Sequence, residues 1–100
     1  KYQAIFLDPP AFGHGPAGEI WQFEKDLAEL LASLTLLMDS STGIIIVNAY
    51  SLGFPAIGLE NLLQSYWPKA TSLQSVELTL RETTARAFLL PTGVAVRAKW

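Results

Sequence analysis

The sequence predicts an α/β protein with the element order β-α-β-α-β-β, in which the last two strands are antiparallel to each other. Two almost unbroken apolar runs, residues 2–7 and 44–47, are typical of strands buried on both faces of a parallel sheet. After each run, leucines recur at intervals of three and four, which indicates amphipathic helices. Apolar and polar residues then alternate over 76–81 and 94–99, which indicates two strands with one wetter face. The length of 100 residues fits one domain.

The first strand is predicted to end at Asp8, because Pro9 and Pro10 follow it. Proline has no N–H for a sheet ladder and favours extended geometry in the residue before it. In open α/β sheets, ligands bind just outside the carboxyl ends of the strands. A carboxylate fixed at this edge, four residues before the ring of Phe12, is therefore a candidate functional group. The alternative is that Asp-Pro-Pro only marks the end of a strand.

A loop rich in glycine and proline follows. Gly13, Gly15, Pro16 and Gly18 predict a mobile or tightly turned segment, of the kind that closes over a substrate. His14 lies within it, where it either touches the substrate or is solvated.

The first helix is predicted to begin at Ile20 and to run for about five turns. Trp21, at its entrance, either packs under the loop or lines a substrate cleft. The apolar stripe of the helix consists of Phe23, Leu27, Leu30, Leu31, Leu34, Leu37 and Met38. Three acidic residues are expected to favour the positive end of the helix dipole: Glu19, Glu24 and Asp26.

Turn residues at 39–43 separate this helix from the second buried strand, which ends at Asn48. Strands in βαβ order are neighbours, so Asn48 and Tyr50 are predicted to lie at the same sheet edge as Asp8. Tyr50 and Ser51 are therefore further candidates for a substrate pocket. The alternative is that these polar residues cap the end of the strand.

A second, short helix is predicted from residue 59 to 66 and ends before Pro68. Residues 83–86 are predicted to form an outer loop between the last two strands. Arg81 and Arg86 are candidates for contact with a nucleic-acid backbone, although two arginines are a weak signal.

Composition restricts the function. The chain is 50% hydrophobic and 16% charged, with a formal net charge of −2, so it lacks the basic surplus of a module that binds phosphate backbone unaided. It has no cysteine and a single histidine, so a disulfide scaffold and a thiolate zinc site are excluded and no metal is expected. Polar and proline residues interrupt the apolar runs before they reach the ~20 residues of a membrane span. We therefore predict a cytoplasmic protein with no membrane partner.

The N-terminal stretch resembles the fourth motif of the class I methyltransferases that use S-adenosylmethionine, which has an acidic or amide residue, two prolines and a nearby aromatic. The likeness is strongest to the ribosomal-RNA large-subunit methyltransferase-like group, whose DPP-x-F-G, glycine-rich loop and E-x-W are similar to Asp8, Pro9, Pro10, Phe12, Gly13, Gly15, Gly18, Glu19 and Trp21. It continues to the PTG at 91–93 and to the terminal residues 97–100. One departure is Ala11, since the aromatic of the amino-methylating motif usually follows the second proline directly.

The resemblance implies a Rossmann-like fold, of which residues 1–100 would be the C-terminal half, because the glycine-rich turn and ribose-binding acid of the cofactor-binding N-terminal half do not occur in them. It implies methyl transfer from S-adenosylmethionine to a nucleobase of RNA, specifically ribosomal RNA. Asp8 would hold the N–H of an exocyclic amine and would also border the cofactor, the Pro9 carbonyl would be a second acceptor, and Phe12 would stack on the base. The substrate side would also include Pro10, Gly13, His14, Trp21, Tyr50 and Ser51.

The alternative function is a non-catalytic α/β interaction module that keeps the methyltransferase fold and pairs with another subunit. Under either function, these 100 residues alone are expected to be inactive and to bind S-adenosylmethionine poorly. The strand at residues 2–7 would also have one unpaired edge, so we expect the isolated chain to self-associate or to be poorly soluble.

Overall fold

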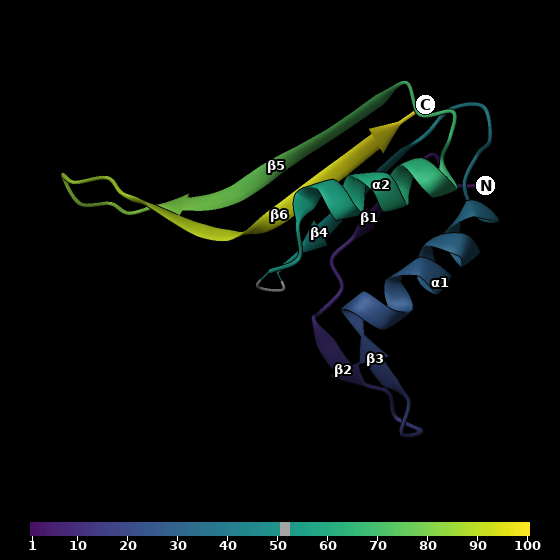
Figure 1. Ribbon diagram of the computed structural model, residues 1–100, viewed down its shortest axis with the longest axis horizontal. Coiled ribbons are helices and arrows are strands. Elements are labelled where there is room, and N and C mark those ends of the chain that lie inside the picture. The colour runs from purple at the N-terminus through teal and green to yellow at the C-terminus, as the bar shows by residue number, and fades with distance from the viewer. Residues whose placement is uncertain (51–52) are drawn as a thin grey trace.

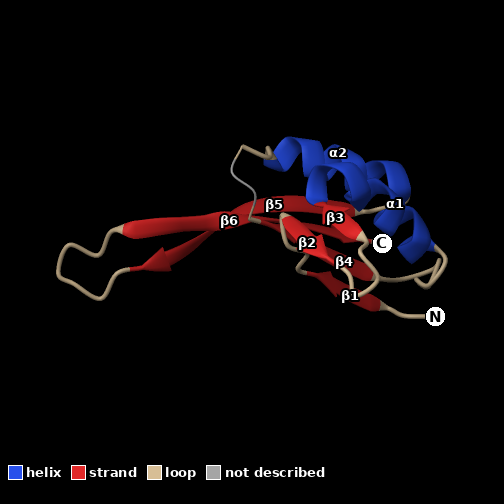
Figure 2. Cartoon of the chain, turned by 90° about the horizontal axis from the view of Figure 1, so that it is seen from below, coloured by secondary structure: helices blue, strands red, loops and turns tan. Residues whose placement is uncertain are grey.

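A four-stranded sheet with both helices on one side forms the body of the protein in the computed structural model, which describes residues 1–50 and 53–100 (Figures 1 and 2). Its strand order is β1-β4-β6-β5. The sheet consists of β1 (Ala4–Leu7), β4 (Ile44–Ala49), β5 (Ser72–Arg81) and β6 (Leu89–Lys99), and the helices are α1 (Phe23–Thr35) and α2 (Ala56–Tyr66). A separate two-stranded sheet contains β2 (Phe12–His14) and β3 (Ile20–Gln22).

The strand directions agree with the predicted order. β1 and β4 are adjacent and parallel, with Leu7 opposite Val47, as the βαβ connection requires. β6 is antiparallel to both β4 and β5. The predicted antiparallel pair at the end of the chain is therefore confirmed, and β6 returns along the middle of the sheet.

Only one face of the sheet is covered by the described residues, so the prediction that the first two strands are buried on both faces is wrong for them. Along β4, Ile45, Val47 and Ala49 are buried, whereas the residues between them are half-buried. Phe6 on β1 is 71% exposed. The reason is that α1 and α2 pack on the same side of the sheet (Figure 2).

The segment after Asp8 is a hairpin, not an open loop, and α1 begins later and is shorter than predicted. The antiparallel β2–β3 pair uses Ile20 to Gln22 as a strand, so α1 starts at Phe23 and has 13 residues. The Asp26 carboxylate accepts the N–H of Gln22 at 2.7 Å and so satisfies a free donor at the start of the helix. Leu37 lies beyond the helix and is 47% exposed.

Glu19 also differs from its predicted role. It precedes the helix by several residues, and its carboxylate accepts the N–H of Ala17 at 3.0 Å. The turn at Gly15–Gly18 is closed by the N–H of Gly15, which donates to the Glu19 carbonyl at 2.8 Å. Glu19 therefore stabilises the β2–β3 turn and does not interact with the positive end of α1.

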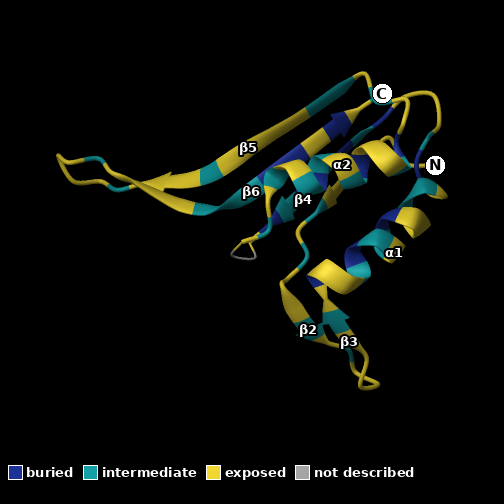
Figure 3. Cartoon of the chain, viewed as in Figure 1, coloured by how far each residue is buried: buried dark blue, intermediate teal, exposed yellow. Residues whose placement is uncertain are grey.

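The core lies between the helices and the sheet, where the buried residues of Figure 3 are concentrated. Each helix contributes apolar residues four positions apart, which is the spacing of one helical face. The largest fully buried side chains are Phe23, Leu27 and Leu31 from α1, Leu59 and Leu63 from α2, and Ile45, Val47 and Val96 from the sheet. The predicted end of α2 before Pro68 is confirmed.

The outer part of the β5–β6 hairpin projects past the helices and is exposed (Figures 1 and 3). Its turn contains the predicted outer loop at residues 83–86. There the Arg86 guanidinium pairs with Glu82 at 2.7 Å, and Arg81 donates to the Ala87 carbonyl at 3.0 Å. Among the described residues, neither helix has the length and apolar character needed to cross a membrane.

Candidate active site at the carboxyl edge of the sheet

Three polar side chains meet where β1 and β4 end. Asp8 directly follows β1, and Asn48 is the residue of β4 after Val47, which is paired with Leu7. The register therefore places Asp8 beside Asn48. The Asn48 side-chain amide donates to Asp8 Oδ1 over a long 3.5 Å contact and to the Tyr50 hydroxyl at 3.3 Å.

Tyr50 takes its electrostatic character from this cluster. Its pKa is raised above the ordinary value, mainly because the phenol hydrogen-bonds to the Asp8 carboxylate and secondarily because the ring is partly desolvated. Ionising the phenol would place a second negative charge beside that carboxylate. Tyr50 is nevertheless 47% exposed to an incoming ligand.

Gly93, within β6, allows the ring of Tyr50 to lie close to the backbone of that strand. Its φ is +138°, and a Cβ there would lie 2.6 Å from the Ala49 carbonyl oxygen and 3.0 Å from Tyr50 Cδ1. No side chain fits at that distance, so only glycine permits the contact. Tyr50 and Gly93 border a hollow of about 330 Å³ between β4 and the β5–β6 hairpin.

The backbone after Asp8 is held in place by bonds that leave one carbonyl free. Trp21 Nε1 donates to the Pro10 carbonyl at 2.8 Å, and the Phe23 N–H donates to the Ala11 carbonyl at 3.0 Å. The Pro9 carbonyl accepts no hydrogen bond from the described part of the chain. Of these three successive carbonyls, Pro9 thus presents an acceptor close to Asp8.

A second group of predicted residues lies apart from this cluster, between the β2–β3 hairpin and α1. Pro10, Gly13, His14 and Trp21 line a hollow of about 670 Å³ together with Glu19, Ile20, Asp26, Glu29, Leu30 and Ser33. The hollow has three carboxylates and one imidazole, so it does not suit a phosphate group. Trp21 lines this hollow and hydrogen-bonds to the loop backbone, as its predicted packing role requires, and its place in a substrate cleft stays a prediction.

Phe12 contacts His14 and is not in contact with the sheet edge. The two rings meet edge-on with their centroids 4.9 Å apart, on one face of the hairpin. Phe12 is 52% exposed. Its ring is therefore accessible for stacking, from the hairpin that projects away from the four-stranded sheet (Figure 1).

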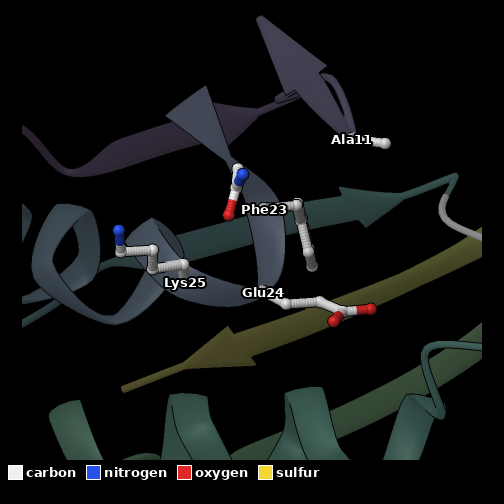
Figure 4. A pocket seen from close by; sticks show the side chains of 5 residues that line it. Ala11, Phe23, Glu24 and Lys25 are labelled. Carbon is white, nitrogen blue, oxygen red and sulfur yellow. The ribbon is translucent and has the colours of Figure 1, made fainter. Parts of the chain in front are cut away.

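A further hollow of about 390 Å³ lies at the first turn of α1 (Figure 4). Its lining includes Ala11, Gln22, Phe23, Glu24 and Lys25. It contains one acid and one base and none of the polar residues from the ends of β1 and β4. We therefore place the candidate site at the sheet edge, where several polar groups converge.

The structure thus brings together Asp8 and Tyr50 as predicted, with Pro9 next in the chain, and separates them from Phe12 and His14. Ser51 lies outside the described residues. Sequence reasoning placed Asn48 at this edge but did not assign it to the site, where it links Asp8 to Tyr50. It also missed Gly93. The PTG at 91–93 was the available signal, since a glycine within a strand often marks a close approach of backbone.

Comparison with solved structures finds a similar protein. The crystal structure of the SAM-dependent methyltransferase from Agrobacterium tumefaciens matches this chain with a TM-score of 0.86 and 25% sequence identity over 98% of the chain. The fold is that of a Rossmann-like methyltransferase. The chain covers 33% of the Agrobacterium protein, so it spans about a third of that length. No protein-family model and no curated protein matches the chain. The match therefore supports a methyltransferase-type fold for this chain.

Proposed function

We propose that this chain forms the substrate side of an S-adenosylmethionine-dependent methyltransferase site, with Asp8 as its central acceptor. The observation that carries the proposal is the carboxylate at the carboxyl end of β1, in contact with the Asn48 amide that also donates to the Tyr50 hydroxyl, in a fold that matches a methyltransferase. In open α/β sheets this edge is where ligands bind.

Each residue has a distinct task in this proposal. Asp8 accepts an N–H from the amine to be methylated, and the free Pro9 carbonyl accepts a second. Asn48 and Tyr50 fix the orientation of the carboxylate. Because the amine is held by acceptors of fixed position, its lone pair is directed before reaction, which is where positioning contributes to rate.

The acceptor at the carboxyl end of β1 suits both S-adenosylmethionine and an amine. S-adenosylmethionine would supply an electrophilic methyl group on sulfur. The Asp8 carboxylate has the charge to border such a cationic group and the acceptor capacity to hold an amine. The residues that bind the rest of the cofactor are proposed to lie in an N-terminal half of a longer protein, for which the threefold greater length of the Agrobacterium structure is the support.

A nucleobase of RNA, and of ribosomal RNA in particular, is the proposed methyl acceptor. An exocyclic amine beside a flat ring needs two acceptors and a stacking surface. The two acceptors would be the Asp8 carboxylate and the Pro9 carbonyl, and the half-exposed ring of Phe12 is the stacking candidate. The net charge of −2 means that phosphate contacts would come from residues beyond these 100. We place such an enzyme in the cytoplasm.

Equilibrium binding of S-adenosylmethionine to the protein that carries this chain, followed by methyl transfer to ribosomal RNA, tests the proposal. Saturable cofactor binding and labelled RNA are expected. Absence of cofactor binding would instead assign the chain to the non-catalytic interaction module. If the cofactor binds but the methyl group is transferred to a different acceptor, only the choice of RNA as the substrate is rejected.

A further inference from the structure

No strand among the described residues pairs with the outer edge of the ten-residue β5, which is the last strand in the sheet order. The β5–β6 hairpin also exposes apolar side chains: Val76, in the four-stranded part of the sheet, is 56% exposed, and further out Leu80 is 63% and Leu90 62% exposed. A two-stranded ribbon is marginally stable in water by itself, and a long apolar edge strand recruits another strand. This edge is therefore expected to pair with another strand.

β5 keeps a regular alternation along this edge. Leu78 is opposite Gly93 and Thr79 is opposite Pro91, so the extra residue of the bulge belongs to β6. The side chains of β5 therefore still point to alternate faces. Leu80 is opposite Leu90, so these two leucines lie on the same face of the ribbon as Leu78, whereas Leu89 is opposite Arg81 on the other face.

The charges of β5 are arranged symmetrically about Thr79. Glu77 and Arg81 are the two charged residues of the strand, and each lies two positions from Thr79. If two copies of the strand pair antiparallel with Thr79 opposite Thr79, Glu77 of one copy lies opposite Arg81 of the other, twice. Leu78 then lies opposite Leu80. Among antiparallel pairings of two β5 strands, this is the one register that sets the acid opposite the base.

We propose that β5 is the interface of a symmetric homodimer in which two β5 edges pair antiparallel about a two-fold axis through Thr79. The paired acid and base would lie on one face and a continuous leucine stripe on the other, so charge and apolar pattern agree on one register. The contact is isologous and closes at two copies.

Nucleic acid is a poorer occupant for the same surface. The hairpin from residue 77 to 91 carries Glu77, Arg81, Glu82 and Arg86, so its acids and bases cancel. Arg86 is also paired with Glu82 at 2.7 Å. A surface with no net positive charge gains nothing from counterion release on a phosphate backbone. A second copy of the chain fits both the charges and the leucines.

Disulfide trapping tests the register directly, because the chain contains no cysteine. Thr79→Cys would place two thiols opposite each other across the axis, and directly opposed residues in antiparallel strands lie about 4.5–5.5 Å apart at Cα, within the range of a disulfide. Ser75→Cys is the matched control, since it lies on the same face and edge but would face residue 83 of the second copy. Under a mild oxidant, we expect covalent dimers from Thr79→Cys and none from Ser75→Cys. Equal cross-linking of both, or of neither, would overturn the register.

Charge reversal provides a second measurement by sedimentation. Glu77→Arg and Arg81→Glu should each weaken the dimer by about tenfold, and the double variant should restore it. The matched reversals Glu24→Arg and Lys25→Glu on α1 should have no effect. A monomeric wild-type chain at about 200 μM would overturn the proposal.

The same experiment separates this edge from that of β1, whose self-association stays a prediction. If Ile5→Lys abolishes association and neither charge reversal on β5 changes it, the association is through β1 and the β5 dimer is rejected. Circular dichroism verifies that each variant is folded. If a reversal unfolds the chain, amide exchange of the wild type decides: protection of 76–81 that rises with concentration supports the dimer, and constant protection rejects it.

Discussion

Gly93→Ala should destabilise the protein by distorting the junction between β4 and β6. The added methyl would lie 2.6 Å from the Ala49 carbonyl oxygen, a backbone atom that cannot move aside cheaply, and 3.0 Å from Tyr50 Cδ1. The φ of +138° adds a conformational cost, because side chains other than glycine rarely adopt it. Strain of about 1–3 kcal/mol and overpacking of about 1–3 kcal/mol predict a total loss of about 2–6 kcal/mol.

The assay is urea denaturation of the purified chain, with Gly18→Ala as the matched control. Gly18 also has a positive φ, +87°, but nothing lies within 4 Å of the position of its Cβ. Its substitution therefore adds strain alone, about 1–2 kcal/mol. The difference between the two variants isolates the clash with the Tyr50 segment. Equal losses would refute the conclusion that close packing at Gly93 positions the site.

Three further outcomes follow from individual contacts. Trp21→Phe, which removes the indole donor to the loop backbone, should lower the free energy of unfolding by about 1 kcal/mol in urea denaturation, and no change would contradict its bracing role. Leu63→Ala, at a fully buried site of α2, should lower it by about 2–5 kcal/mol, whereas Ile57→Ala at 62% exposure should cost far less. The pKa of Glu82 is lowered from 4.5 to about 2, chiefly by Arg86. The stabilising interaction of the Glu82 carboxylate should therefore be complete above pH 4.5 and be lost as pH falls toward about 2. In the variant Arg86→Gln, the pKa of Glu82 measured by NMR titration should return toward 4.5.

The order of the sheet elements was predictable because apolar runs and leucine periodicity depend on local residue patterns. The β2–β3 hairpin was not, since its glycines and prolines indicate turns without specifying that the residues around them pair. The same pairing delays the start of α1 to Phe23. One-sided burial of β1 also escaped prediction, because an apolar run does not indicate how many faces are covered. Phe6 belongs to the apolar run of β1 and is nevertheless 71% exposed, because its face of the sheet is not covered by the described residues.

The candidate site was predictable to the extent that strand order determines it. Asp8 and Tyr50 meet because the strands before them are parallel neighbours, and that follows from the βαβ connection. Phe12 was expected near the same edge from its spacing of four residues, but the hairpin holds it against His14. Gly93 joins Tyr50 from a distant part of the sequence, and although a glycine within a strand signals a close approach of backbone, it does not specify which residue approaches.

The most direct test of the proposed role of the carboxylate is to measure methyl transfer by the Asp8→Ala variant of the protein that carries this chain. If Asp8 holds the target amine, turnover at saturating substrate should fall by ~10²-fold or more while cofactor affinity stays nearly unchanged, because the interaction contributes mainly in the transition state. Glu60→Ala, which removes a carboxylate from α2, should leave turnover unchanged. Undiminished turnover by Asp8→Ala would contradict the account, and an equal loss of cofactor affinity would move Asp8 from the substrate side to the cofactor site.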